Sequence, residues 1–417
     1  MAGRFARVET RRRAGTFLHG LLADLPRKNC WTIAEHAGEV DPYGMQHFLA
    51  RASWDTDGVR DDLRDYVMGA LGDADGVLVV DETGHLKKGC HSVGVQRQYT
   101  GTAGRIENAQ VAVYLAYAGR GGHAMIEREL YLPASWTDNP DRLAEAGVPA
   151  EVEFATKPAL ATGMLTRALA TGVAARWVTG DEVYGADPAL RAELEVQRVG
   201  YVLAIGCDRR IRTAAGPLRA DEAAAGLPRR AWRRLSAGAG AKGQRIYEWA
   251  WIDHTDREHR NDEHDTQQWS LLIRRHPDTG ELAYYRCYSP DVVPLRELVR
   301  VAGRRWAIEE SFQAGKGLAG LDEHQVRGWT SWRRWTLLAM IAHALLAVLA
   351  AQADPPPAGG GLIALTCNEI RRLFTVLIIE PARALACPLA WSHWRRQHQY
   401  RAKISHYQRR GCDPPMP

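Results

Sequence analysis

The chain has 417 residues, of which 46% are apolar and 25% charged, and its formal net charge is +5. These values are typical of a soluble globular protein, and the length predicts roughly two to four domains rather than one simple core. The seven cysteines are scattered and form no CxxC pair, which favours reduced thiols in the cytoplasm and excludes a disulfide framework or a Cys-rich zinc site. No apolar segment follows the basic N-terminus, so we expect no signal peptide.

Basic residues gather at both ends of the chain. No acidic residue lies between Pro381 and Cys412, where arginines alternate with aromatic side chains, and several arginines also precede Lys28. Basic ends around a mixed middle indicate a polyanionic partner. A solvated surface or a disordered tail would have a similar composition.

Residues 1–73 are predicted to form a small helical domain. The apolar spacing favours helices at 17–25, 30–37, 42–52 and 57–71. Short helices with arginine-rich starts suit a domain that sits on the DNA backbone. A purely structural lid explains the pattern equally well.

The pattern changes at Gly76, where the apolar run VLVV at 77–80 predicts a central buried strand that ends at Asp81. Further strands are predicted at 92–100, 109–118, 124–132, 176–179 and 201–205, and helices at 157–171 and 187–199. This order predicts a mixed α/β fold. We assign its core to residues 74–206 together with 291–352.

Residues 207–290 break the rhythm with alternating, tryptophan-rich runs, and we interpret them as a β-rich insertion. His254, His259 and His264 lie in its hydrophilic loop, which we expect to be a solvated loop rather than a metal site.

After Pro290 the sequence predicts helices at 292–315 and 329–351. The apolar stretch 335–351 is near the lower limit for a membrane span, about 17 residues, and we interpret it as a buried helix. Residues 353–417 are predicted to contain a linker, one helix at 362–379 and the basic tail.

Three carboxylates stand out by their context. Asp81 and Asp181 each follow a short apolar strand, and Glu309 lies on an apolar helical stripe between Arg305 and Lys316. Carboxylates at neighbouring strand ends, joined by one from a helix, can bind two hard divalent cations for displacement at phosphorus. Each residue could also have a purely structural role: aspartates cap helices and form turns, and Glu309 could simply pair with Arg305.

With these residues identified, the chain resembles the DDE transposases of bacterial insertion sequences, whose catalytic core is RNase H-like. The resemblance matches Asp81 in VLVVDETG and Asp181 in WVTGDEVYG to the two aspartates, and Glu309 to the glutamate. One branch carries the signature Tyr-x2-Arg-x3-Glu-x6-Lys. Arg305, Glu309 and Lys316 match its last three positions, but Ala302 stands where the tyrosine is expected.

The resemblance implies Mg²⁺-dependent cleavage at transposon ends and strand transfer into target DNA, with Mn²⁺ able to replace Mg²⁺. It further implies double-stranded DNA and a second copy of the chain as partners, no membrane, and a place at the bacterial nucleoid. Two alternatives stay open: a domesticated DNA-binding protein that no longer transposes, and a nuclease for RNA–DNA hybrids.

DNA contacts follow from the same resemblance. Arg305 and Lys316 are expected at phosphates near the scissile bond. The tryptophans of the insertion that could stack on a flipped base are Trp249, Trp251 and Trp269, although tryptophan in a sheet more often belongs to a core. The other expected backbone contacts are Lys87, Lys88, Arg97, Arg105, Arg327, Arg395, Arg396, Arg401 and Lys403.

Overall fold

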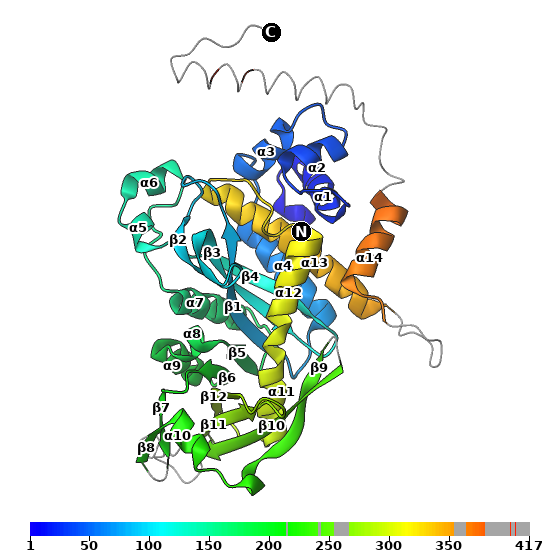
Figure 1. Cartoon of the computed structure of the whole chain (residues 1–417). Coiled ribbons are helices and arrows are strands. Elements are labelled where there is room, and N and C mark those ends of the chain that lie inside the picture. Colours follow the sequence, from blue (N-terminus) through cyan, green and yellow to red (C-terminus); the bar gives the residue numbers. More distant parts are fainter. Residues whose placement is uncertain are drawn as a thin grey trace.

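A computed structural model of the chain describes residues 1–213, 216–240, 243–253, 267–353, 364–379, 401 and 405. Within these residues a ten-stranded mixed sheet runs through the molecule, with helices on both of its faces (Figure 1). Its first six strands are β1 (Val77–Leu86), β2 (Gln96–Thr100), β3 (Arg105–Ala118), β4 (His123–Leu130), β5 (Trp177–Gly180) and β6 (Gly200–Ile205).

The centre of the sheet has the strand order β4-β3-β1-β5-β6, with β2 also paired to β3. On one side of β1 the pairings β1–β3 and β3–β4 are antiparallel, and on the other side the pairings β1–β5 and β5–β6 are parallel. A strand between such neighbours is covered on both faces, and Val77–Val80 are all fully buried. This arrangement confirms the predicted mixed α/β, RNase H-like fold class.

The predicted insertion is rich in β-structure, and its strands extend the central sheet. β12 pairs with β6, and β11, β10 and β9 follow in that order (Figure 1). A hairpin of β7 (Arg210–Thr213) and β8 (Gly216–Arg219) and helix α10 (Ala220–Ala225) pack on a second, smaller apolar cluster. The four added strands are β9 (Arg233–Gly240), β10 (Gly243–Asp253), β11 (Gln268–Arg275) and β12 (Leu282–Ser289). His254, His259 and His264 lie outside the described residues.

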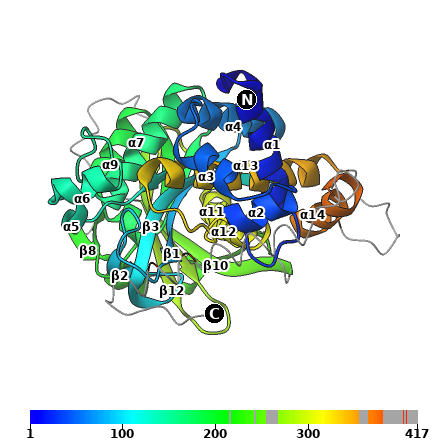
Figure 2. The same cartoon turned by 90° about the horizontal axis from the view of Figure 1, so that it is seen from above.

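The predicted N-terminal helices gather around α13 (Trp329–Gln352), as Figure 2 shows. Phe17 packs edge-on against Trp335, with ring centroids 5.4 Å apart. In the described part of the chain α13 alone is long and apolar enough to cross a membrane, but 72% of its most apolar window is buried inside the fold. It is therefore a core helix here. The N-terminal helices are α1 (Val8–Leu22), α2 (Cys30–His36), α3 (Tyr43–Ala50) and α4 (Thr56–Leu71).

The remaining helices cover the sheet. Successive side chains of a strand point to opposite faces. On β1, one face packs against α7 and the other against α12. These helices are α5 (Ala134–Thr137), α6 (Pro140–Glu145), α7 (Lys157–Ala170), α8 (Glu182–Gly185), α9 (Pro188–Val196), α11 (Leu295–Arg304), α12 (Trp306–Ala319) and α14 (Cys367–Phe374), which a π-helical turn, Thr375–Ile379, follows.

Several predicted element boundaries are wrong; the first helix, predicted at 17–25, is Val8–Leu22. β1 does not end at Asp81 but continues to Leu86, because residues 81–86 stay paired to β3 after the pairing with β5 has ended. The predicted strand 92–100 begins only at Gln96. The predicted helix 292–315 is two helices that meet at Arg305, whose amide bonds to the Ala302 carbonyl at 3.4 Å.

Candidate active site

Two of the predicted carboxylates follow the last residue pair of the same parallel ladder. The last pair of the parallel ladder between β1 and β5 is Val80 with Gly180, so Asp81 and Asp181 occupy the next position on each chain. Asp81 remains in β1, whereas Asp181 is the N-cap of α8, and its Oδ1 accepts a hydrogen bond from the Val183 amide at 2.9 Å. The structure thus brings these two residues side by side.

This pair of carboxylates is electrostatically unfavourable. Asp81 is only 7% exposed. Its burial, and then the neighbouring Asp181 carboxylate, raise its pKa to about 8, while the Arg305 guanidinium acts in the opposite direction. Burial also raises the pKa of Asp181, with Glu82 as the next cause. A positive charge placed between the aspartates would relieve their repulsion.

Arg305 is the cation that pairs with Asp81 in the structure. Its Nη1 lies 3.1 Å from Oδ2 of Asp81 and 3.8 Å from Oε1 of Glu309. Glu309 is a partly exposed residue at the edge of the apolar stripe, with its side chain 43% exposed. Glu310 instead contacts His123, whose Nε2 is 3.1 Å from Oε2 of Glu310. Arg305 therefore joins the first and third predicted carboxylates across β1 and α12. Its spacing to Glu309 indicated the second of these contacts, whereas the contact with Asp81 had no signal in the sequence.

A row of polar contacts runs along β1 from this point. Alternate side chains of β1 face α12 and the loop that follows it. Side-chain atoms of Asp81 and Arg305 lie 3.1 Å apart, those of Thr83 and Lys316 2.7 Å apart, and those of His85 and His324 3.2 Å apart. We call these three contacts the polar row.

Two of the lysines expected to bind DNA contact residues of the polar row. Lys316 is half-buried, its Nζ donates to Thr83 and to Thr102 at 3.2 Å, and burial lowers its pKa. Lys87 donates to the carbonyl of His324 at 2.8 Å, and burial lowers its pKa to about 8. Lys316 therefore lies on the same helix face as Arg305, whereas Lys87 is tied to the loop after α12.

The donor set fits a hard divalent cation. Asp81, Asp181 and Glu309 offer only carboxylate oxygens, the ligands that Mg²⁺ prefers, and a guanidinium nitrogen already lies between two of them. Among the described residues, however, no group of three or more His, Cys, Asp or Glu side chains is close enough to hold one metal ion. To share one ion, the three carboxylates would therefore have to move closer together, and Arg305 would have to leave Asp81.

A cleft of about 900 Å³ opens beside Asp181 and Arg305, between the insertion and the junction of α11 and α12. Arg245, Arg274 and Tyr247 line it from the insertion, and Trp306 lines it from α12. Trp306 is 51% exposed, which is unusual for so large an apolar side chain. Trp306 was not among the predicted site residues. It directly follows Arg305 in the sequence, and that position could have indicated it.

The three tryptophans predicted to stack on a base are less accessible. Trp249 also lines the cleft, but it is 1% exposed and its Nε1 donates to the Leu235 carbonyl at 3.2 Å. Trp251 and Trp269 are partly buried against the main apolar core. Of the tryptophans around the cleft, Trp306 presents far more surface than Trp249.

The other expected DNA contacts lie on the surface wherever the structure describes them. Lys88, Arg97, Arg327 and Arg401 are exposed, and the exposed Arg105 pairs with Glu107 at 2.9 Å. Arg395, Arg396 and Lys403 fall outside the described residues.

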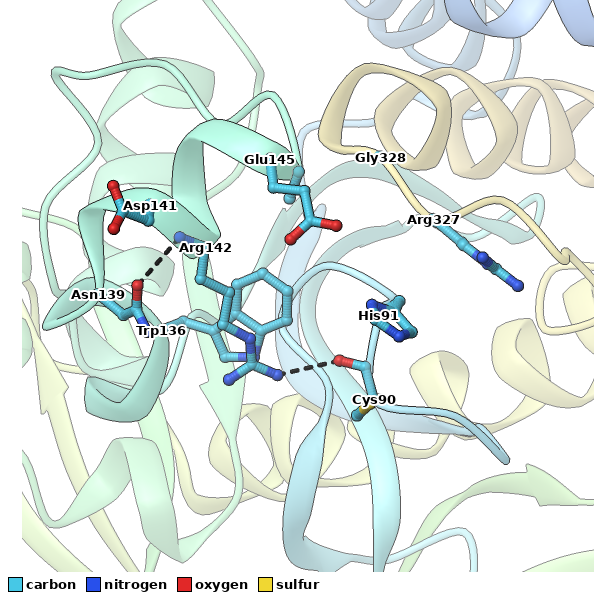
Figure 3. A pocket seen from close by; sticks show the side chains of 10 residues that line it. Cys90, His91, Trp136, Asn139, Asp141, Arg142, Glu145, Arg327 and Gly328 are labelled. Atoms are coloured by element: carbon cyan, nitrogen blue, oxygen red, sulfur yellow. Dashed lines mark hydrogen bonds between the residues drawn. The ribbon is translucent and has the colours of Figure 1, made fainter. Parts of the chain in front are cut away.

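Arg327 lines a separate pocket of about 760 Å³ (Figure 3). Across the pocket the Arg142 guanidinium lies 3.7 Å from the centre of the Trp136 ring and donates to the Cys90 carbonyl at 3.0 Å. Acidic Glu145 lines the same pocket. None of the three predicted carboxylates lines this pocket, which makes it a weaker candidate for the reacting DNA than the cleft that Asp181 lines.

Replacement of Asp81 by asparagine is expected to stabilise the metal-free protein at alkaline pH. The pKa of Asp81 is about 8 in the folded chain and 3.8 as the ordinary value, so the folded state binds the extra proton and loses stability as pH rises between these values. Asparagine does not ionise, so Asp81→Asn should gain stability over the unchanged protein on the order of 1–3 kcal/mol at pH 8.5 and little at pH 4. Urea unfolding at both pH values measures the difference.

Asp75 provides the control for this experiment, because Arg120 lowers its pKa. Asp75→Asn should bring no gain at pH 8.5. Equal stabilities of Asp81→Asn and the unchanged protein at both pH values would contradict a buried, repelled carboxylate at position 81.

Comparisons with known proteins bear on this site. Residues 1–271 match a family model described as DDE superfamily endonuclease, a stretch that includes Asp81 and Asp181 but ends before Glu309. Over 191 residues the chain is 28% identical to a probable transposase for insertion sequence element IS701 from Microchaete diplosiphon. This alignment covers 45% of the chain and 47% of that protein, so the chain spans about half the length of this curated relative.

A cryo-EM structure of the piggyBac transposase synaptic complex with hairpin DNA also aligns with the fold. The alignment covers 94% of this chain and 76% of that chain, with a TM-score of 0.42 and 10% identity. So loose a likeness says nothing about the site.

Proposed function

Since this chain belongs to the DDE superfamily endonuclease family, we propose that it is a transposase, which cuts the ends of an insertion sequence and joins them to target DNA. The observation that carries the proposal is the pairing of Val80 with Gly180, which sets Asp81 beside Asp181. The likeness of part of the chain to a probable insertion-sequence transposase supports the same function.

Asp81, Asp181 and Glu309 are the residues that would hold Mg²⁺, or Mn²⁺ in its place. Two such ions, when bound, activate a water or a 3′-hydroxyl and stabilise the leaving oxygen of a displacement at phosphorus. The role of the three side chains is to supply negative charge at one place, which the burial of Asp81 makes costly in the absence of a cation.

Arg305 has two roles in this proposal. Without DNA it neutralises Asp81 and reaches toward Glu309. When it leaves the carboxylates, its guanidinium can contact a phosphate oxygen with charge-assisted hydrogen bonds. Lys316, which Thr83 holds on the same helix face, is the second proposed phosphate contact near the reacting bond.

The cleft beside Arg305 is the proposed place for the DNA end. Arg245 and Arg274 bring positive charge to it, and the exposed ring of Trp306 offers a stacking surface for an unpaired base. The exposed cations Lys88, Arg97 and Arg327 are proposed as outer contacts to the DNA backbone.

The setting of the reaction is proposed in the same way. We expect a homodimer that holds two DNA ends, acting at the nucleoid in the bacterial cytoplasm. The cysteines in the described residues, at positions 30, 90, 207, 287 and 367, are all free, which suits a reducing compartment.

The test uses the purified chain and a supercoiled plasmid that carries the two DNA segments flanking its gene. Nicks or double-strand breaks at the segment ends are expected in Mg²⁺ or Mn²⁺, and none in EDTA. Joining of the freed ends to a second plasmid would support strand transfer. A gel shift on the same DNA without any cleavage in either metal would instead favour a domesticated DNA-binding protein.

A further inference from the structure

The parallel ladder that aligns the two aspartates stops just before them. β1 and β5 pair from Val77 with Trp177 to Val80 with Gly180. Beyond that pair β1 stays paired to β3 only, while the residues that follow β5 turn into α8. No ladder hydrogen bond therefore fixes Asp81 relative to Asp181, although their like charges repel each other.

A side-chain bridge lies directly beyond this point. Glu82, the residue after Asp81, points to the opposite face of β1, toward α7 and α8. Its Oε2 accepts a hydrogen bond from the Tyr184 hydroxyl at 2.7 Å, and its Oε1 lies 2.6 Å from Nζ of Lys157. We call Glu82, Lys157 and Tyr184 the Glu82 bridge.

Both ends of the bridge lie on helices that pack on the sheet. Tyr184 is fully buried, and it lies on the single turn of helix that Asp181 caps. Gly185 follows, and a Cβ there would lie 1.8 Å from the Ala204 carbonyl oxygen, so the backbone of α8 lies close against β6. Lys157 is the first residue of α7, which packs on the same sheet face.

The bridge is not itself suited to hold a metal ion. Each oxygen of the Glu82 carboxylate already has a protein partner, and the side chain is only 18% exposed. Lys157 pairs with Glu82 and offsets part of the charge that raises the pKa of Asp181. Besides this charge, the carboxylate acts on the site by joining α7 and α8 to β1.

We propose that Glu82, Lys157 and Tyr184 are positioning residues that set the spacing of Asp81 and Asp181 for metal binding. This inference rests on the proposed function, because it assumes that the two aspartates share a metal site. Glu82, which directly follows Asp81, and Tyr184, which lies three residues after Asp181, thereby gain a role in the geometry of that site.

The test compares two buried tyrosines that each donate to a glutamate. Tyr184→Phe removes the hydroxyl of the bridge. Tyr201→Phe removes the hydroxyl that donates to Oε1 of Glu195 at 2.6 Å, on β6, and serves as the matched control. Binding of Mn²⁺ to the full chain without DNA is measured by calorimetry, and cleavage is measured separately at saturating Mn²⁺.

Tyr184→Phe is expected to weaken Mn²⁺ binding by about 5–10-fold and to slow cleavage by about 10–100-fold, because small displacements of reacting groups are costly. Tyr201→Phe should change neither quantity by more than about 2-fold, even if both variants lose similar thermal stability. Glu82→Gln retains an oxygen acceptor for Tyr184, so its Mn²⁺ affinity should fall between those of the unchanged protein and Glu82→Ala.

Unchanged Mn²⁺ binding by Tyr184→Phe and by Glu82→Ala would overturn this inference but leave the proposed function untouched. An equal loss in Tyr201→Phe would also overturn it, because the effect would then be one of general stability. If the unchanged protein bound no Mn²⁺, or bound it no better than Asp81→Asn, the proposed metal site would fail together with the inference.

Discussion

Replacement of Glu309 by glutamine is expected to reduce metal-dependent DNA cleavage by about 10³-fold or more, because a metal ligand that stabilises charge at phosphorus contributes several kcal/mol. DNA binding should be retained, since glutamine has the same shape and the change removes a negative charge. Glu309 is the member of the triad that the family match does not reach, because the match ends at residue 271. Nicking of supercoiled plasmid and a gel shift, run side by side in Mg²⁺, measure the two properties.

Glu310→Gln is the matched control, one residue away on the same helix. Glu310 is exposed and its carboxylate contacts His123 rather than the site. Its replacement should change cleavage by no more than about 3-fold, as is usual for an exposed charge away from the site. Similar losses in both variants, or full activity of Glu309→Gln, would remove Glu309 from the proposed site.

Replacement of Arg305 by alanine is expected to separate metal binding from cleavage. The guanidinium lies 3.1 Å from Asp81, so its removal should tighten Mn²⁺ binding without DNA by about 10-fold at pH 9. Cleavage should nevertheless fall by about 10²-fold, because a preorganised cation at the scissile phosphate is lost. The high pH matters, because Arg305 lowers the pKa of Asp81 and its loss lets protons compete more strongly with the metal.

Arg304→Ala is the control for this prediction. Arg304 ends α11 next to Arg305 and is likewise partly buried, but no ion pair to the predicted carboxylates is seen for it in the described residues. It should leave Mn²⁺ affinity unchanged. Weaker Mn²⁺ binding by Arg305→Ala at pH 9 would mean that the guanidinium orders the carboxylates and does not compete with the metal.

The strands that lead to the two aspartates could be predicted because their signal is local. VLVV and WVT are short apolar runs that stop at Asp81 and shortly before Asp181, and a buried strand needs such a run. The spacing of Arg305, Glu309 and Lys316 likewise placed all three on one helix face. Local pattern and resemblance together therefore named the candidate carboxylates before any tertiary contact was known.

What could not be predicted depends on long-range pairing. The polar sequence DETGHL looks like a loop after a strand, yet its pairing with β3 keeps it in β1. The alternating runs of the insertion indicate strands but not their neighbour, and β12 pairs with β6 of the core. The break at Arg305 also has no local signal, since its backbone stays helical, with φ −54° and ψ −33°.

The polar row has a consequence for when the enzyme becomes complete during synthesis. Asp81 and Asp181 are translated well before Glu309, and all the strands of the sheet precede α12 in the chain. The place of α12 is fixed by its apolar packing, with Phe312 against Tyr114, and by the contacts of Arg305 and Lys316 with β1. A nascent chain that has emerged only as far as β12 therefore contains both aspartates and every strand of the sheet but still lacks Glu309. Under the proposed function, a product of premature termination before α12 would be unable to cut DNA.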